Sequence, residues 1–314
     1  AEALDTVLAQ TFDDFEMLVI DDGPTDSTLE VLQRVADPRA RLIRREHRGL
    51  VAALNHGLRQ ARAPILARMD ADDLCQPQRF AAQFELLSEN PRLAAVGCLV
   101  EMFPSENVRA GMRHYLDWLN SLTSPEEIAK NIFVEMPLLH PSMLLRTDAV
   151  RAVGGYRYGR FPEDYDLLLR LHAAGWQFAK VPQVLYRWRE HAKRLSRRSP
   201  AYRSEAFRSL KAKYLAQTVL HNNRPFRIWG AGRDGRRLCR ELEAHHCRPL
   251  AFIDIDPAKI GREVRGVPVI GRRDIPFDGA LILVCVGAKG ARQLIRTFLS
   301  ARGLREGETF LCVT

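Results

Sequence analysis

The stretch that decides the fold is PILARMDADD at residues 64–73, where a short apolar run passes directly into a group of acids. An earlier stretch, FEMLVIDDG at residues 15–23, repeats this pattern. Both apolar runs are typical of buried strands, and the acids follow the carboxyl end of each strand. Because ligands of α/β proteins bind beyond the carboxyl ends of their strands, both acidic groups lie where a ligand is expected.

Further strands and helices alternate around these two stretches. The spacing of apolar residues predicts helices at 25–36, 50–61 and 163–174 and strands at 41–44 and 142–146, whereas 91–112 and 120–141 are less regular. In the last third, strands are predicted at 225–229, 249–254, 280–286 and 309–313, with helices at 236–246 and 289–302. Alternation of this kind predicts α/β domains with largely parallel sheets.

Length and composition fit a globular protein with two domains. At about 150 residues per domain, 314 residues correspond to two. We expect an α/β domain at 1–200, a basic helical linker at 201–223 and a smaller α/β domain at 224–314. No run approaches the ~20 apolar residues of a membrane-spanning helix, and the N-terminal residues lack the pattern of a secretory signal. The six cysteines are scattered and form no CxxC motif, which favours a reduced, cytoplasmic protein without a zinc knuckle.

Positive charge is concentrated in one segment of the chain. The net charge is +9, and residues 187–213 contain ten basic residues against two acids. The segment is either a solvated helical face or a surface for phosphates or an anionic membrane, which would place the protein at the inner face of the membrane. Nucleic acid is not expected as a partner, because few aromatic residues are interleaved and no nucleic-acid-binding motif accompanies the run.

The acids after the strands suggest a metal site. Asp70 and Asp72, two residues apart after a strand, can converge on a divalent cation such as Mg²⁺ or Mn²⁺, which oxygen ligands and substrate phosphates hold. The alternative is that Asp72 or Asp73 caps the next helix. With the acids at 21–22 and 163–164, the cluster suits a metal–diphosphate substrate and a general base. The latter pair also suits the dipole of its helix.

Five segments in this order carry a family resemblance: FEMLVIDDGPTDSTLEVL, ARMDADD, HPSMLLRTDAVRAVGGYR, FPEDYDLLLRL and LYRWREH. They resemble the family 2 glycosyltransferases, which have the GT-A fold, over residues 1–200. The resemblance implies metal-dependent transfer of a sugar from a nucleotide diphosphate sugar to a hydroxyl of a saccharide or lipid-linked acceptor. Inversion at the anomeric carbon and a place in cell-surface polysaccharide or glycoconjugate synthesis are also implied. In the family a first strand precedes the first helix, so we expect this chain to lack that strand and to expose a strand edge.

The resemblance assigns roles on the donor side. The donor-binding candidates are Asp21, Asp22, Arg68 and Asp70. Asp22 matches the acid that contacts the nucleotide base, and Asp70 matches a residue near the ribose. Asp72 matches the metal ligand, with Mn²⁺ or Mg²⁺ as the cofactor. His191 matches a histidine that approaches the metal or the diphosphate, with an exposed polar residue in a basic loop as the alternative.

On the acceptor side, Asp164 matches the family's catalytic base. A carboxylate in this place accepts the proton of the attacking hydroxyl. Glu163 is the competing carboxylate, and we expect it to orient the acceptor. His140, Gly155 and Tyr156 match segments that border the acceptor pocket, although a buried, hydrogen-bonded histidine is an equal interpretation of His140.

The last third carries a second motif, GAGRDG at 230–235, between a predicted strand and helix. Asp254 ends the next strand, 19 residues after Gly235, which is the context of a dinucleotide-binding fingerprint. The segment resembles the Rossmann-like N-terminal domain of bacterial sugar O-acyltransferases, which can hold nucleotide sugars. Gly230, Gly232, Gly235 and Asp254 are therefore nucleotide-binding candidates, with tight packing of strand and helix as the alternative reason for the glycines.

Together these features predict a metal-dependent, inverting glycosyltransferase with an accessory Rossmann-like domain. The alternatives are a non-catalytic protein that binds nucleotide sugars or acts as a scaffold, and an NAD-dependent oxidoreductase that uses the second domain.

Overall fold

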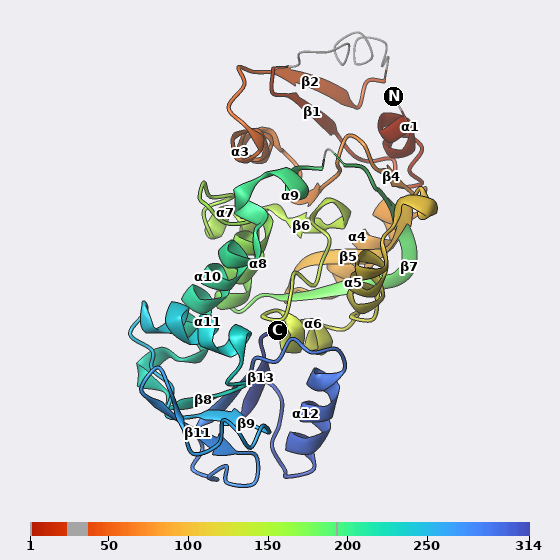
Figure 1. Cartoon of the computed structure of the whole chain (residues 1–314). Helices are drawn as coiled ribbons and strands as arrows, with labels where there is room; N and C mark the ends of the chain where they lie inside the picture. Colours follow the sequence, from red (N-terminus) through yellow and green to blue (C-terminus); the bar gives the residue numbers. More distant parts are fainter. Residues whose placement is uncertain (1, 24–36, 193) are drawn as a thin grey trace. The chain divides into compact units, whose positions relative to one another are not determined.

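The computed structural model describes residues 2–23, 37–192 and 194–314 (Figure 1). It divides into two compact units, Ala1–Ile128 with Pro137–Ala201, and Ala129–Met136 with Tyr202–Thr314. The helix predicted at 25–36 lies outside the described residues. Every helix in the described part of the chain is too short or too polar to cross a bilayer.

The described residues of the first unit form two sheets. A parallel pair consists of β1 (Met17–Asp21) and β2 (Ala40–Arg44). A five-stranded sheet has the order β3 (Ile65–Ala67), β6 (Leu144–Arg146), β5 (Leu93–Phe103), β7 (Gln177–Arg189) and β4 (Leu74–Cys75). Within the larger sheet only β5 and β7 pair in parallel. The expectation of a largely parallel sheet is therefore wrong for the five-stranded sheet, although it holds for the pair β1 and β2.

The two longest strands, β5 and β7, are among those that the apolar spacing does not predict. They run side by side along almost their whole length (Figure 1). The first six residues of β5 are all buried, so this part of the strand lacks the alternation of apolar and polar residues by which a strand is recognised. Short irregularities in the pairing around Leu99 further break the period of the two strands.

The helices of the first unit flank these sheets. Their bounds are α1 (Glu2–Leu8), α3 (Leu50–Gln60), α4 (Arg79–Glu89), α5 (Ala110–Asn120), α7 (Thr147–Ala152), α8 (Glu163–Ala173) and α9 (Leu195–Arg198), and α6 (Pro125–Asn131) spans the boundary with the second unit. The buried face of α4 is partly polar. It contains Arg79, Phe80, Gln83 and Leu87 at the helical spacing of one face.

The second unit is a six-stranded sheet with three main helices. Its strands are ordered β10 (Glu263–Val264), β11 (Val267–Gly271), β9 (Phe252–Asp254), β8 (Phe226–Trp229), β12 (Leu281–Val284) and β13 (Phe310–Cys312). All neighbours are parallel except β10 and β11, so the sheet is mixed. The helices are α10 (Ser204–Tyr214), α11 (Arg233–Glu243) and α12 (Ala291–Ser300). In the segment predicted as a linker, α10 packs against α11.

Two glycines of the 230–235 motif, one at the end of β8 and one in the first turn of α11, are required by close packing. A Cβ atom on Gly235 would lie 1.8 Å from the carbonyl oxygen of Gly230. Gly230 has a φ of +119°, and a Cβ there would lie 2.5 Å from the carbonyl oxygen of Cys285. Gly232 differs, because no atom lies within 4 Å of a Cβ built on it. The packing interpretation of this motif therefore holds for Gly230 and Gly235 but gives no reason for Gly232.

The same substitution at the two helix-side glycines tests this difference. Gly235→Ser forces apart β8 and α11, so we expect the free energy of unfolding to fall by about 1–3 kcal/mol or more. Gly232→Ser has room and places a favoured residue at the N-cap of α11, so the stability should stay within about 0.5 kcal/mol. Urea denaturation followed by tryptophan fluorescence measures both. Equal losses in the two variants would contradict the packing argument.

Candidate functional site

Three carboxylates gather in the loop after β3. Oxygen atoms of Asp70, Asp72 and Asp73 all lie within 4.8 Å of one another. Asp73 is buried, and its two oxygens accept hydrogen bonds from the Tyr186 hydroxyl and the Arg189 amide, each at 2.7 Å. Burial raises the pKa of Asp73 to about 7, against the lowering effect of these hydrogen bonds. Asp73 is thus tied to β7, and Asp70 and Asp72 are the more accessible members.

The helix-cap interpretation of these acids is wrong. The helix that follows is α4, which begins at Arg79 and has Gln78 at its N-cap, without a capping hydrogen bond from a side chain. Neither Asp72 nor Asp73 reaches it as a cap. The convergence of the three carboxylates is therefore not explained by the start of that helix.

His191 lies against the same cluster. Its Nε2 atom is 2.7 Å from Oδ2 of Asp72, although the two residues are far apart in the sequence. Strand β7 brings His191 close to Asp72. The last residue of the strand, Arg189, donates a hydrogen bond from Nε to the backbone oxygen of Asp72. The structure therefore brings together the two predicted metal ligands, and His191 is not simply an exposed polar residue.

On the predicted donor side, Arg68 and Asp70 form an ion pair. The Arg68 guanidinium lies 2.5 Å from Oδ1 of Asp70, and the Arg68 side chain is only 15% exposed. Arg68 directly follows β3, and Asp70 is the first acid of the cluster. A cation at this place can attract the phosphates of a donor while it limits the repulsion among the carboxylates.

Asp21 is the last residue of β1, and Asp22 follows it. Both side chains accept hydrogen bonds from nearby backbone amides. Asp22 accepts hydrogen bonds from the amides of Arg48 and Gly49 and forms an ion pair with Arg45 at 3.0 Å. Asp21 is buried and accepts a hydrogen bond from the amide of Gly23. Among the described residues, neither side chain makes a hydrogen bond or ion pair with the cluster after β3, so their place on a donor remains a prediction.

On the predicted acceptor side, His140 and Tyr156 form a buried pair. His140 Nε2 lies 2.8 Å from the Tyr156 hydroxyl. Burial, aided by the charge of Arg68, holds the pKa of His140 well below its usual range, so the imidazole is neutral. His140 is thus a buried, hydrogen-bonded histidine, and its position beside Tyr156 keeps it a candidate for the acceptor border.

The loop that carries Tyr156 is fixed from two sides. Asn55 in α3 accepts from the Tyr156 amide at 2.9 Å and donates to the Tyr156 carbonyl at 2.8 Å. Arg170, in a buried ion pair with Asp166, donates to the carbonyl of Gly155. Gly155 has a φ of +65°, and a Cβ there would lie 2.7 Å from Oδ1 of Asn55, which explains the glycine. Its role is therefore to allow this close approach.

Asp164 and Glu163 lie in the first turn of α8. Glu163 is buried and Asp164 half-buried, and the Asp164 carboxylate accepts a hydrogen bond from the Tyr165 amide. Burial and then the charge of Glu163 raise the pKa of Asp164 to about 7, while the charge of Arg68 opposes the rise. The charge of Arg68 also lowers the pKa of His140, so it acts on both of these predicted acceptor-side residues.

In the second unit, Asp254 supports the glycine loop. One carboxylate oxygen accepts from the amide of Ala231 and lies 3.3 Å from the Lys259 ammonium, and the other accepts from the amides of Ile255 and Asp256. A cavity of about 320 Å³ lies at this loop and is lined by Gly230, Gly232 and Asp254, among others. Three of the four candidates are thus together on one cavity, and Gly235 packs beneath the loop.

Some site residues were missed by reasoning from sequence. Tyr186 and Arg189 belong to the segment LYRWREH, in which only His191 was marked. Asn55 is a polar residue within an amphipathic helix, and nothing local shows that it bonds to a loop a hundred residues away. The Asp166–Arg170 pair had a usable signal, since opposite charges four apart face each other on a helix.

Comparison with known proteins identifies the family of the chain. The family model "Glycosyl transferase family 2" matches residues 1–154. EpsE of Bacillus subtilis (strain 168), assigned as a glycosyltransferase, is 32% identical over 209 residues, which cover 64% of this chain and 72% of that protein. The amylovoran biosynthesis glycosyltransferase AmsE of Erwinia amylovora is 29% identical over 200 residues, 63% of this chain and 73% of the relative.

A solved structure shows the same fold. The crystal structure of S. aureus TarS 1–349 in complex with UDP-GlcNAc superposes with a TM-score of 0.56 at 15% identity, covering 78% of this chain and 68% of that one. The first unit, with its acids at strand ends, is thus an α/β unit of the GT-A-like class. The family model and the 32% identity with EpsE establish that the chain belongs to glycosyltransferase family 2.

The bracing of the Tyr156 loop by Asn55 leads to a prediction. Asn55→Ala removes two hydrogen bonds to buried backbone groups, so we expect a loss of about 1–3 kcal/mol in stability together with reduced sugar transfer. Asn120→Ala is the matched control, since Asn120 bonds in the same way to both backbone groups of Val100. It should lose similar stability but keep its transfer rate per folded molecule. Equal rates in the two variants would mean that the loop serves no site.

Proposed function

We propose that the protein is a metal-dependent, inverting glycosyltransferase that moves a sugar from a nucleotide diphosphate sugar to an acceptor hydroxyl. The observation that carries the proposal is the gathering of the Asp70, Asp72 and Asp73 carboxylates in the loop after β3, with His191, two residues beyond β7, in contact with Asp72. Family membership supports the use of a nucleotide sugar. The relative named for amylovoran biosynthesis supports a role in polysaccharide or glycoconjugate synthesis, with a saccharide or lipid-linked acceptor.

The donor set fits a divalent cation such as Mn²⁺ or Mg²⁺. Carboxylate oxygens from three residues lie within reach of one another, and hard cations prefer such ligands. Asp72 and His191 would hold the ion, and the Asp70 carboxylate lies beside that of Asp72. When bound, such an ion neutralises negative charge on the diphosphate leaving group. Asp73, by contrast, is engaged with Tyr186 and positions the loop.

Asp164 is proposed as the general base. The acceptor hydroxyl must lose its proton as its oxygen attacks the anomeric carbon, and the Asp164 carboxylate takes that proton. A pKa near 7 makes this carboxylate a stronger base than an ordinary aspartate while it stays largely ionised above neutral pH. A single displacement with a base on the acceptor side inverts the sugar centre. The neighbouring buried Glu163 raises the basicity of Asp164 and orients the acceptor.

The second unit is proposed to be an accessory Rossmann-like domain. Its parallel strands and the glycine loop before α11 support this assignment, with the domain limits expected at 1–200 and 224–314. Contact of the basic segment with an anionic membrane remains a further proposal, as does a place at the inner face of the membrane. The exposed Arg198 and Arg203 are its main support, since other cations of the segment, such as Arg194 and Arg197, form ion pairs with Glu190.

Hydrolysis of the donor tests the proposal most directly. Purified protein with Mn²⁺ is incubated with a panel of nucleotide sugars that includes UDP-GlcNAc, and released nucleoside diphosphate is measured. We expect slow hydrolysis of at least one donor without acceptor and faster release with a saccharide acceptor. Binding of a donor without any turnover would instead identify a non-catalytic nucleotide-sugar-binding protein.

The metal assignment predicts the effect of Asp72→Asn. Loss of one carboxylate should weaken metal-dependent binding of the donor by roughly tenfold or more, because ligand charge sets the affinity of such sites. Calorimetry with the donor identified by the panel, with and without Mn²⁺, measures this. Asp117→Asn, at an exposed position in α5, is the control and should bind as the unmodified protein does. Donor affinity that is independent of Mn²⁺ in the unmodified protein would contradict the assignment.

The base assignment predicts the effect of Asp164→Asn. Turnover should fall about 10²–10⁴-fold with little change in donor affinity. In the unmodified enzyme the rate should rise with pH through about 7, since the carboxylate must be ionised to accept a proton. The variant should lose this pH dependence.

Stability provides a second readout for Asp164. A carboxyl with a raised pKa in the folded state binds more protons when folded, so ionisation destabilises the fold as pH rises toward 7. Asp164→Asn should therefore be more stable than the unmodified protein at pH 8.

Glu163→Gln is the control for the measurement of turnover. If it loses turnover while Asp164→Asn keeps it, the other carboxylate is the base.

A further inference from the structure

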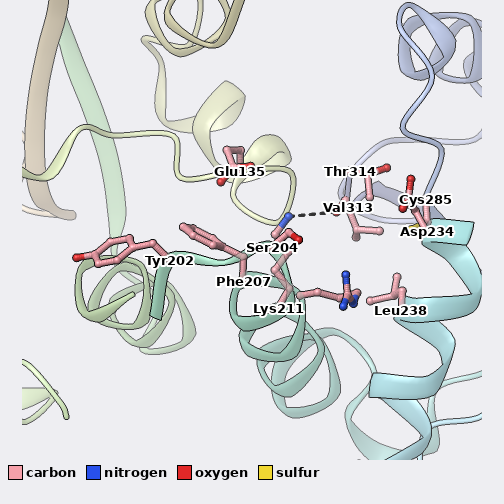
Figure 2. A pocket seen from close by; sticks show the side chains of 11 residues that line it. Glu135, Tyr202, Ser204, Phe207, Lys211, Asp234, Leu238, Cys285, Val313 and Thr314 are labelled. Atoms are coloured by element: carbon pink, nitrogen blue, oxygen red, sulfur yellow. Dashed lines mark hydrogen bonds between the residues drawn. The ribbon is translucent and has the colours of Figure 1, made fainter. Parts of the chain in front are cut away.

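A second cavity in the second unit, separate from the proposed transfer site, has the features of a ligand site. It has a volume of about 390 Å³ (Figure 2). Its lining comes from α10, from α11 and from the residues that follow β12 and β13, with Glu135 from the segment 129–136. This places it at the carboxyl ends of parallel strands, where α/β sheets bind their ligands.

The strand order strengthens this placement. From β8 the chain continues to β9 on one side of the sheet and later returns to β12 on the other side. The carboxyl ends of β8 and β12 thus flank a point where the direction of winding reverses, and the cavity at the glycine loop, lined by Trp229 and Cys285, lies there. The 390 Å³ cavity adjoins that cavity on the side of β13. Asp234 and Cys285 line both this cavity and the one at the glycine loop.

The cavity contains buried positive charge. Lys211 is 8% exposed, and its ammonium donates to the carbonyls of Val134 and Val313 (Figure 2 shows the latter). Among the described residues, no carboxylate lies within ion-pair distance of this ammonium. Arg208, one turn earlier on α10, lies 3.8 Å from Glu241, and its buried Nε has no hydrogen-bond acceptor.

Such an arrangement favours an anionic ligand. A buried cation without an anionic partner costs free energy, and a bound phosphate or carboxylate would relieve that cost. Burial lowers the pKa of Lys211, while the nearby Glu135 carboxylate acts in the opposite direction. A bound anion next to the ammonium would favour its charged form further.

The rest of the lining suits a ligand with hydroxyl groups. The carboxylates of Glu135 and Asp234 can accept hydrogen bonds but would repel a bare anion. Ser204 adds a hydroxyl, and Tyr202 and Phe207 add aromatic surface for the C–H faces of a ring. The volume lies near the lower end of the range of about 300–1,000 Å³ for small-molecule sites, which favours a monosaccharide over a whole nucleotide sugar.

We propose that this cavity binds a monosaccharide that carries one phosphate or carboxylate group. Lys211 and Arg208 hold the anionic group, and Glu135 and Asp234 accept hydrogen bonds from the sugar hydroxyls. The site does not depend on the proposed glycosyl transfer, because every residue that lines it belongs to the second unit.

Calorimetry on the full chain in metal-free buffer tests the proposal. The probes are glucose 1-phosphate and glucuronate, compared with glucose and inorganic phosphate. We expect at least one of the two anionic sugars to bind more tightly than both comparison compounds. Lys211→Met should weaken that binding by roughly tenfold or more, the effect of losing a hydrogen bond to a charged group. Arg203→Met, an exposed cation beside α10 outside the lining, should bind normally.

Further variants keep the test decisive. Asp72→Asn should bind the anionic sugar as the unmodified protein does, which separates this cavity from the proposed donor site. If Lys211→Met does not fold, Arg208→Gln carries the same expectation. The proposal is overturned if neither anionic sugar binds, if inorganic phosphate binds as tightly as the sugar, or if the lysine or arginine substitution leaves the affinity unchanged.

Discussion

The buried pair of Arg79 and Gln83 in α4 is the interaction on which the candidate site depends. Arg79 is completely buried, donates to the carbonyls of Arg68 and Pro141, and lies 5.0 Å from the centre of the Tyr186 ring. Gln83 receives a hydrogen bond from Arg79 and donates to the carbonyls of Val96 and Ser142. A buried guanidinium is tolerated only when its hydrogen-bond donors have acceptors. The backbone at Arg68 and at Pro141 must therefore stay in place to accept these hydrogen bonds. The acidic loop and the His140 turn are positioned by the same two side chains.

Several elements on or next to which the candidate site residues lie could be predicted from the sequence, because their signals are local. Strands β1 and β3 and helices α3 and α8 all appear where the apolar spacing predicts them, within a few residues at their ends. The sheet they join could not be predicted in this way. Strand β6 pairs antiparallel with both of its neighbours, and that pairing depends on contacts between residues distant in sequence. The buried β5 lacks the alternation that would reveal it.

The same division applies to the site itself. Asp70, Asp72 and His191 were found through motifs, because their chemistry requires particular residue types at particular places. The residues that fix them in space were not found, since an arginine and a glutamine on a helix are ordinarily interpreted as solvated. Only the tertiary structure shows that Arg79 and Gln83 face inward and that Asn55 bonds to the Tyr156 loop. A motif thus predicts which groups react, and long-range packing decides whether they meet.

The basic residues at 187–213 are close together in the sequence and would suggest a single cationic surface. In the structure they have different environments. Arg194 and Arg197 pair with the buried Glu190, whereas Lys211 lies inside a cavity of the second unit. A paired arginine adds little long-range field, and a buried lysine acts only on what enters its cavity. The excess of positive charge therefore divides into structural ion pairs, a few exposed arginines and one enclosed site for an anion, so net charge alone does not define a membrane-binding surface here.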